Sequence, residues 1–153
     1  MPSIRALAAS DAEPARALVR AALDGTPYLK RTFEQLDVAL GGDDPECVGM
    51  LAQSAQGAVG VLLHGRVAGA TRVEKVHVLI GDNAESLGFL LRALSATSDA
   101  RMIISELPGA KAFATATAAL AANGFTREGS VEGFFSEGTA LELLVWRRAE
   151  VPG

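Results

Sequence analysis

The sequence predicts an α/β (α+β) fold built on a mixed, mostly antiparallel sheet with helices on both faces. Strand-like alternation over residues 71–80 leads through Gly81-Asp82-Asn83 directly into apolar residues at helical spacing, from Leu87 to Leu94. Two further strand-like segments precede it, and three successive strands favour an antiparallel meander. The 153 residues, 49% hydrophobic and 21% charged, fit one domain over residues 1–153 with a sizeable core.

The first half of the chain predicts one strand, two helices and then three strands. Residues 3–7 suit a short strand, after which Asp11 offers an N-cap to a helix that continues to Leu23. Thr26-Pro27, a cap followed by a first-turn proline, begins a second helix that stops at Gly41-Gly42. The strands that follow are expected over residues 46–54, 59–63 and 71–80.

The second half alternates helices with strands and closes with a hairpin. The helix after residue 83 ends near Ser98, and a strand is expected over residues 102–107. Another helix closes at Asn123-Gly124. The expected hairpin strands are residues 125–135 and 140–148. The predicted order is therefore β-α-α-β-β-β-α-β-α-β-β.

Charge and composition argue against several classes of protein. The formal net charge is −4 and the Lys and Arg residues are scattered, so no basic surface for nucleic acid is expected. Cys47 is the only cysteine beside two histidines, which gives no disulfide framework and no Cys/His metal spacing; we interpret it as a small buried strand residue. Charges near the N-terminus argue against a secretory signal, and no apolar run is long enough to span a membrane. We therefore expect a soluble cytoplasmic protein.

The junction over residues 81–86 is a candidate anion site. A turn from a strand end into a helix leaves N–H groups free beside the positive end of the helix dipole, where phosphates bind. The same residues also fit a capping box, in which Asp82 and Glu85 satisfy the free N–H groups of the helix. Two carboxylates would repel a phosphate by roughly 1 kcal/mol each at a solvated separation of about 4 Å. Both interpretations stay open on the sequence alone.

The order of elements and the residues at three places resemble the GCN5-related N-acetyltransferases, the GNAT superfamily. In that family the fourth strand is followed by a pyrophosphate loop, Gln/Arg-x-x-Gly-x-Gly/Ala, and here Asn83-Ala84-Glu85-Ser86-Leu87-Gly88 fills that register. Residues 120–125, LAANGF, are similar to a helix-to-strand junction where a tyrosine commonly stands four residues before the glycine; Leu120 stands there instead. Residues 52–61 look like the family's second hairpin, with its glycine-containing third strand.

The resemblance implies acetyl-CoA as co-substrate and no metal. In the family the fourth and fifth strands splay apart, and the fourth strand pairs with the pantetheine arm of acyl-CoA. Transferred by register, this implies backbone contacts at Val76 and Val78 and an open wedge between residues 76–80 and 102–106. The implied phosphate contacts are Asn83, Ala84, Ser86, Leu87 and Gly88.

The resemblance also implies catalytic roles. Glu74 occupies the place of a general base that removes a proton from the substrate amine in many members, although an ion-paired strand residue is an equal alternative. Simple alternation places His77 on the face of Lys75 and Leu79 and opposite Val78, where a packed or surface histidine is expected.

Two functional hypotheses follow. The leading one is an acyl-CoA-dependent N-acyltransferase that transfers an acetyl group from acetyl-CoA to a small-molecule or peptide amine by direct attack. Tyr28 lies in the region that lines the acceptor pocket of relatives, and core packing is its alternative role. The family's tyrosine protonates the departing thiolate, which Leu120 cannot do. The competing hypothesis is a catalytically silent GNAT-like fold that serves as a binding or dimerisation module, such as a homodimer.

Overall fold

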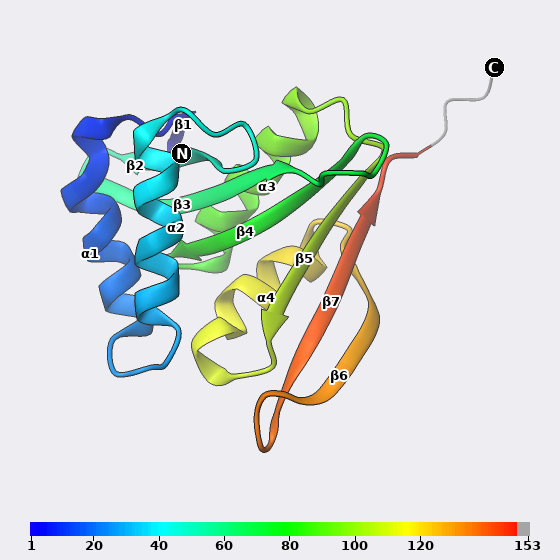
Figure 1. Cartoon of the computed structure of the whole chain (residues 1–153). Coiled ribbons are helices and arrows are strands. Elements are labelled where there is room, and N and C mark those ends of the chain that lie inside the picture. The colour runs from blue at the N-terminus through cyan, green and yellow to red at the C-terminus, as the bar shows by residue number, and fades with distance from the viewer. Residues whose placement is uncertain (150–153) are drawn as a thin grey trace.

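The computed structural model describes residues 1–149 and contains a seven-stranded sheet between two layers of helices (Figure 1). The strands lie in the order β1-β2-β3-β4-β5-β7-β6, and every neighbouring pair is antiparallel except β4 with β5. The strands are β1 (Ser3–Ala6), β2 (Val48–Ser54), β3 (Gly57–Arg66), β4 (Val73–Gly81), β5 (Met102–Pro108), β6 (Thr126–Ser136) and β7 (Thr139–Arg147). The predicted fold class and order of elements are confirmed. Residues 150–153 of the predicted single domain lie outside the described part.

The helices divide the core in two. The helices are α1 (Ala12–Leu23), α2 (Leu29–Gly41), α3 (Ala84–Thr97) and α4 (Ala114–Ala122), with short 3-10 turns η1 (Ala9–Asp11) and η2 (Lys111–Phe113). One core joins α1 and α2 to one face of the sheet, and a second joins α3 and α4 to the other face. Leucine is the commonest residue in both cores, followed by alanine in the core with α3 and α4 and by valine in the core with α1 and α2. Across residues 1–149, no helix is long and apolar enough to cross a membrane.

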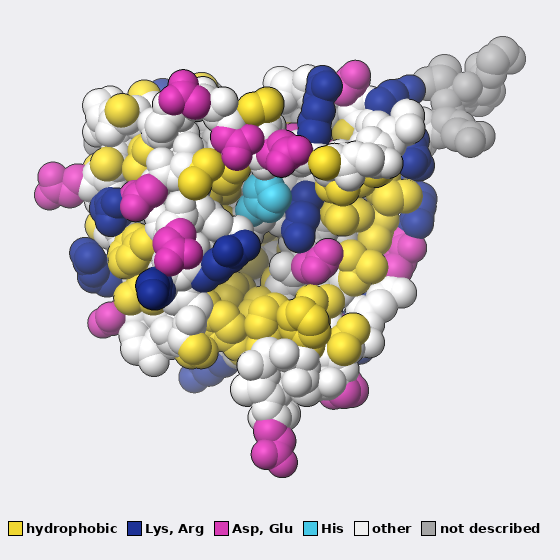
Figure 2. Space-filling model, viewed as in Figure 1, with side chains coloured by type: hydrophobic (Ala, Val, Ile, Leu, Met, Phe, Trp, Pro, Cys, Tyr) yellow, Lys and Arg dark blue, Asp and Glu magenta, His cyan; other side chains and the backbone are white. Residues whose placement is uncertain are grey.

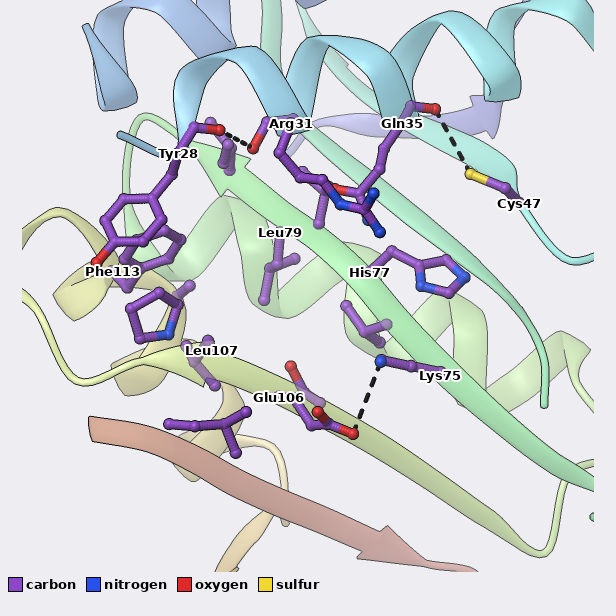
Figure 3. A pocket seen from close by; sticks show the side chains of 18 of the residues that line it. Tyr28, Arg31, Gln35, Cys47, Lys75, His77, Leu79, Glu106, Leu107 and Phe113 are labelled. Carbon is purple, nitrogen blue, oxygen red and sulfur yellow. Dashed lines mark hydrogen bonds and ion pairs between the residues drawn. The ribbon is translucent and has the colours of Figure 1, made fainter. Parts of the chain in front are cut away.

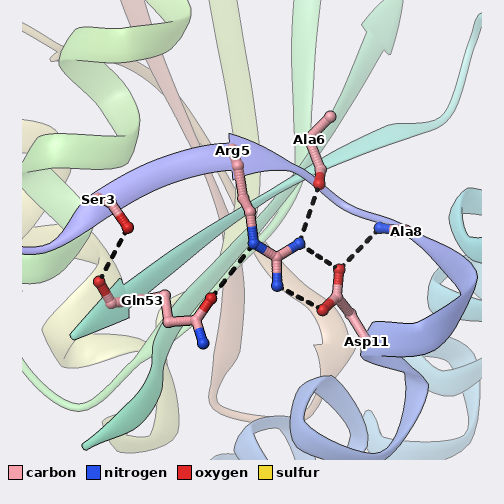
Figure 4. Close-up of polar contacts among 6 residues, drawn as sticks. All are labelled: Ser3, Arg5, Ala6, Ala8, Asp11 and Gln53. Carbon is pink, nitrogen blue, oxygen red and sulfur yellow. Dashed lines mark hydrogen bonds and ion pairs between the residues drawn. The ribbon is translucent and has the colours of Figure 1, made fainter. Parts of the chain in front are cut away.

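Asp11 ties β1 to the first helical turn and is not the predicted side-chain cap of α1 (Figure 4). Its carboxylate oxygens accept hydrogen bonds from the Arg5 guanidinium at 2.6 and 2.7 Å and from the Ala8 N–H at 2.8 Å. Arg5 also donates to the Gln53 side chain on β2 at 3.2 Å. The carboxylate turns back toward the strand because a bidentate, charge-assisted pair is stronger than a bond to a neutral helical N–H.

The start of α2 also differs from the prediction. The Thr26 hydroxyl donates to the Leu23 carbonyl at 2.6 Å and accepts from the Tyr28 N–H at 3.3 Å. Thr26 and the proline after it therefore form a turn, and the helix begins at Leu29. Its predicted glycine stop is confirmed, because Gly42 ends the helix in the left-handed conformation, with φ 74°.

Candidate functional site

β4 and β5 are paired along only part of their length. Their parallel ladder ends at the rung that joins Val76 to Ser105. Beyond this rung β4 stays paired with β3, and β5 stays paired with β7. The two strands therefore present unpaired inner edges to each other over residues 77–81 and 106–108. The predicted wedge exists, but on β5 it begins at residue 106 and not at residue 102, because residues 102–105 are still paired with β4.

A cavity of about 1010 Å³ occupies the wedge and crosses the sheet. Its lining includes Tyr28 and Arg31 of α2 on one face and Ala116 and Leu120 of α4 on the other. Figure 2 shows a hollow in the centre of the α2 face, with a band of hydrophobic side chains along one side of it. Figure 3 shows side chains from α2, β4 and β5 turned toward this space. An elongated ligand that carries amide groups could pair with the open strand edges.

A bulge in β4 interrupts the alternation of its side chains. Leu63 and His64 are consecutive in β3 but pair with Val78 and Val76, which leaves His77 as an extra residue. Val76 consequently packs in the core with α3 and α4, whereas Val78 packs with α1 and α2. The predicted alternation is wrong beyond His77 because the bulge adds one residue to the strand.

His77 shares a face of β4 with Lys75, as predicted, and both line the cavity (Figure 3). Leu79 was predicted on that face as well, but it packs toward α3 and α4. The His77 Nε2 atom lies 2.7 Å from the Glu46 carbonyl oxygen. Because a carbonyl can only accept, Nε2 carries the hydrogen, and Nδ1 of the neutral ring carries the free lone pair. Burial lowers the pKa of His77 from its ordinary value of 6.5. The ring is therefore neutral at pH 7 and able to take up a proton.

Glu74 lies on the opposite face of β4 from His77 and outside this cavity. Its Oε1 atom is 2.5 Å from Nδ1 of His64 on β3, and both side chains are largely buried. Strand alternation explains the placement, because Glu74 is an odd number of residues from His77. A carboxylate that does line the cavity is Glu106 of β5, whose Oε1 lies 3.6 Å from Lys75 Nζ across the wedge (Figure 3).

α3 begins at Ala84, directly after residue 83 as predicted, and Asn83 is its N-cap. The Asn83 Oδ1 atom accepts the Ser86 N–H at 2.8 Å. The Asp82 N–H donates to a backbone carbonyl of β3 at 2.9 Å, so this residue still belongs to the sheet. The predicted capping box of Asp82 and Glu85 is wrong, because Glu85 is the second helical residue and the box requires an acid at the third.

The other predicted phosphate contacts differ in accessibility. Leu87 is fully buried, and a Cβ atom on Gly88 would lie 3.1 Å from side-chain nitrogen atoms of Arg92 and Asn123. Gly88 therefore permits close packing between α3 and the end of α4. Because the Ser86 N–H is occupied by the cap, the N–H groups of the first two helical residues are those left for an anion.

Tyr28 belongs to an aromatic group at the cavity (Figure 3). Its ring makes edge-to-face contacts with Phe113, at a centroid distance of 5.1 Å, and with Phe135 at 5.7 Å. β6 leaves its regular ladder with β7 over residues 132–135, which carries Phe134 and Phe135 toward α2. These two rings remain 57% and 39% exposed. The consecutive phenylalanines were the sequence signal for this part of the site, and the strand pattern alone did not place them.

The α4 side of the cavity carries Leu120 and Ser105. Leu120 is fully buried at the position where the resemblance places a tyrosine. Ser105 is 4% exposed and lines the cavity, and its Oγ atom forms none of the side-chain hydrogen bonds within residues 1–149. Sequence reasoning missed Ser105, although a lone hydroxyl between the buried apolar residues Ile103 and Leu107 was a visible signal.

Comparison with known proteins identifies the fold. No protein-family model and no curated protein sequence matches this chain. Among solved structures, an aminoglycoside 6'-acetyltransferase type Ii is similar with a TM-score of 0.78 and 13% identity, over 98% of this chain and 99% of the other. A Desulfovibrio desulfuricans protein assigned to the GNAT acetyltransferases gives 0.77 and 16%, over 96% and 99%. A ribosomal-protein-alanine N-acetyltransferase from Brucella melitensis gives 0.68 and 15%, over 95% and 99%. The chain has the GNAT fold, as the resemblance implied.

Proposed function

We propose that this chain is an acyl-CoA-dependent N-acyltransferase that transfers an acetyl group from acetyl-CoA to an amine. The observation that carries the proposal is the unpaired inner edge of β4, residues 77–81, beside a cavity that crosses the sheet. A pantetheine arm contains amide groups, and these can supply the hydrogen bonds that the strand edge lacks. Structures with this fold include an enzyme named for aminoglycosides and one named for a ribosomal protein, so both small-molecule and peptide amines are candidate acceptors.

The residues along the wedge fit such an arm. Val78 is paired only with β3, so its backbone is unpaired on the side that faces β5. Val76 also pairs with Ser105 of β5, so it can offer a ligand only a backbone group that this pairing does not use. The phosphate end would lie at the N-terminus of α3, where the first-turn N–H groups and the helix dipole favour an anion. Of the contacts implied by register, Ala84 keeps a free N–H group, as does Glu85 beside it, whereas the N–H groups of Ser86 and Leu87 are both held by Asn83.

His77 is the base that the geometry supports best. Glu74, the base implied by the resemblance, is bonded to His64 on the other face of β4. An amine arrives largely as an ammonium ion and must lose a proton before its nitrogen can attack the thioester carbon. The neutral His77 ring takes that proton at Nδ1 while its Nε2–H stays bonded to the Glu46 carbonyl. The new C–N bond forms as the C–S bond breaks, the electron pair of the broken bond leaves with sulfur, and the nitrogen releases its second proton to water.

The acceptor would enter from the α2 face. Tyr28 and Phe135 form its aromatic wall, and the Lys75–Glu106 ion pair crosses the wedge on the same side. Both partners of that pair are about one-third exposed, so it contributes little to stability, about 0–1 kcal/mol. It can therefore separate at low cost when a charged acceptor binds.

Calorimetric titration with acetyl-CoA tests the proposal, using two matched variants of α4. Ala116 lines the cavity, whereas Ala121 is exposed on the same helix. We expect the wild type to bind, Ala116→Phe to lose at least tenfold in affinity because the ring fills the wedge, and Ala121→Phe to bind as the wild type does. Thermal melts establish that both variants fold. Equal binding by all three proteins would place the ligand elsewhere, and no binding by the wild type would reject the proposal.

A silent binding module is the second candidate, and two observations favour it. Asp82 and Glu85 put carboxylates beside the N-terminus of α3, where an anion would have to bind. Leu120 supplies no proton donor at the position of the family's tyrosine. A wild-type protein that folds but gives no heat with acetyl-CoA would favour this candidate.

A further inference from the structure

Ser105 is a buried hydroxyl without a role in holding the fold together. It is 4% exposed, lies opposite Val76 in the last rung of the β4–β5 ladder and lines the cavity. Its Oγ atom forms none of the side-chain hydrogen bonds within residues 1–149, yet it is not among the fully buried atoms that lack a partner, so it is open to the cavity. A hydroxyl that bonds to no other part of the protein adds little to the stability of the fold, and it is free to donate a hydrogen bond to a ligand in the cavity.

The side chain of Ser105 lies on the α4 face of the sheet. Ile103 and Leu107, two residues to either side, pack in the core with Leu120 of α4, and alternation along β5 places Ser105 on that same face. His77 lies on the opposite side of the wedge, toward α2. A group held at the closed end of the wedge would therefore meet a base from one face and a hydroxyl donor from the other.

The closed end of the wedge is where the reacting thioester would lie if the proposed function is right. Phosphates at the N-terminus of α3 sit next to the end of β4, and the arm then runs back along the strand toward Val76. The five residue steps from Gly81 to Val76 cover roughly 17 Å at about 3.3 Å each. An arm that spans this distance would bring its acyl end to the last rung, between Val76 and Ser105.

We propose that the Ser105 hydroxyl donates a hydrogen bond to the sulfur atom of CoA as the C–S bond breaks. It thereby takes over part of the role of the tyrosine that Leu120 replaces. Ser105 keeps its proton throughout: the ammonium proton goes to His77, the sulfur leaves as a thiolate with the electron pair of the C–S bond, the new amide nitrogen releases its second proton to water, and the thiolate later takes a proton from water. A donor aimed at sulfur stabilises its charged form and so lowers the pKa of a bound thiol. This inference rests on the proposed function, because it needs CoA in the wedge.

The test measures the thiol pKa of free CoA bound to the protein, which requires no acceptor. Thiolate absorbance in the ultraviolet is followed as a function of pH for the wild type, Ser105→Ala and Ser105→Thr. Ser95→Ala serves as control, because the Ser95 hydroxyl on α3 is bonded to the Arg92 carbonyl, away from the cavity. Affinity for desulfo-CoA, which lacks the thiol, is measured in parallel.

We expect the wild type to hold the bound thiol pKa below that of free CoA and Ser105→Ala to raise it by about one pH unit. Ser105→Thr should restore the lowered value, Ser95→Ala should not change it, and desulfo-CoA should bind the wild type and Ser105→Ala equally. The same thiol pKa with and without the hydroxyl would overturn the role of Ser105 while leaving the proposed function standing. If Ser105→Ala does not fold, an unshifted thiol pKa in the wild type alone would overturn it. Absence of CoA binding by the wild type would reject both proposals.

Discussion

At the scale of single residues, Asp11 joins β1 to the first helical turn through three polar contacts. Its buried carboxylate satisfies the Arg5 guanidinium and the Ala8 N–H and so holds β1 to the start of α1 (Figure 4). We expect Asp11→Asn to reduce the free energy of unfolding by about 1–3 kcal/mol at pH 7, because the charge-assisted pair is lost and Arg5 keeps a poorer partner. Urea unfolding of both proteins measures the difference.

The lowered pKa of Asp11 determines how this difference in the free energy of unfolding changes with pH. The hydrogen bond from Arg5 lowers the pKa of Asp11 below its ordinary value of 3.8. A carboxylate whose pKa is lower in the folded state stabilises the fold above the unfolded pKa, and this contribution is lost as the pH falls through the folded pKa. The difference between the wild type and Asp11→Asn should therefore be constant above about pH 5 and shrink below 3.8. A difference that stays constant down to pH 2 would contradict the ion pair.

His77 offers a second prediction about a single residue. Burial lowers its pKa, more than its bond to the Glu46 carbonyl raises it. NMR titration of the imidazole signals should therefore give a pKa below 6.5, with His77→Gln used to assign the resonance against His64. A pKa at or above 6.5 would contradict the effect of burial, and a pKa well above the working pH would leave His77 largely charged and unable to serve as the base.

At the scale of elements, the sequence predicted the strands and helices that have a regular hydrophobic period. It did not predict features in which a single residue changes the local backbone geometry. The alternating apolar residues of β4 and the leucine spacing of α3 gave the correct elements, because burial of one face dictates both patterns. The bulge at His77 could not be predicted, since it depends on how β3 pairs with β4 and leaves no mark on local composition. The opposite faces of Val76 and Val78 follow from that bulge.

Helix ends were difficult for a related reason. Asp82, Asn83 and Glu85 all suit a helix start, and which one caps depends on how far the sheet extends. Because the Asp82 N–H still pairs with β3, the helix starts one residue later than a capping box at Asp82 requires. The candidate site shows the same limit: Tyr28 and the wedge were anticipated, whereas Ser105, Phe134 and His77 acquire their places through tertiary packing.

The cap gives a prediction about α3. Asn83→Ala should reduce the free energy of unfolding by about 0.5–2 kcal/mol, because the Ser86 N–H loses its acceptor. The matched variant Asp82→Ala should change it by less than about 0.5 kcal/mol, since Asp82 contributes its backbone N–H and that bond is kept. Denaturant unfolding of the two variants compares them directly. A larger loss from Asp82→Ala would restore the capping box predicted from the sequence.

At the scale of the whole molecule, the sheet separates two hydrophobic cores, and it is open at one place, between β4 and β5. β2 to β4 contribute to both cores. β5, β7 and β6 form a second group of strands, and its backbone ladder with the first group is limited to the four rungs below the wedge. Where those rungs end, neither helical layer closes the gap, and the cavity reaches both faces of the sheet. A sheet that leaves two central strand edges unpaired forgoes backbone hydrogen bonds, which is consistent with a ligand that replaces them.

The most direct test of this account follows amide hydrogen exchange along β4 with and without CoA. Bound pantetheine should slow exchange within residues 77–81, because it pairs with the open edge of the strand. The control is the exposed edge strand β6, residues 126–131, where exchange should not change. Slower exchange confined to β4 and the N-terminus of α3 is the predicted result. Exchange along residues 77–81 that is unaffected by saturating CoA would contradict the assignment of the wedge as an acyl-CoA site.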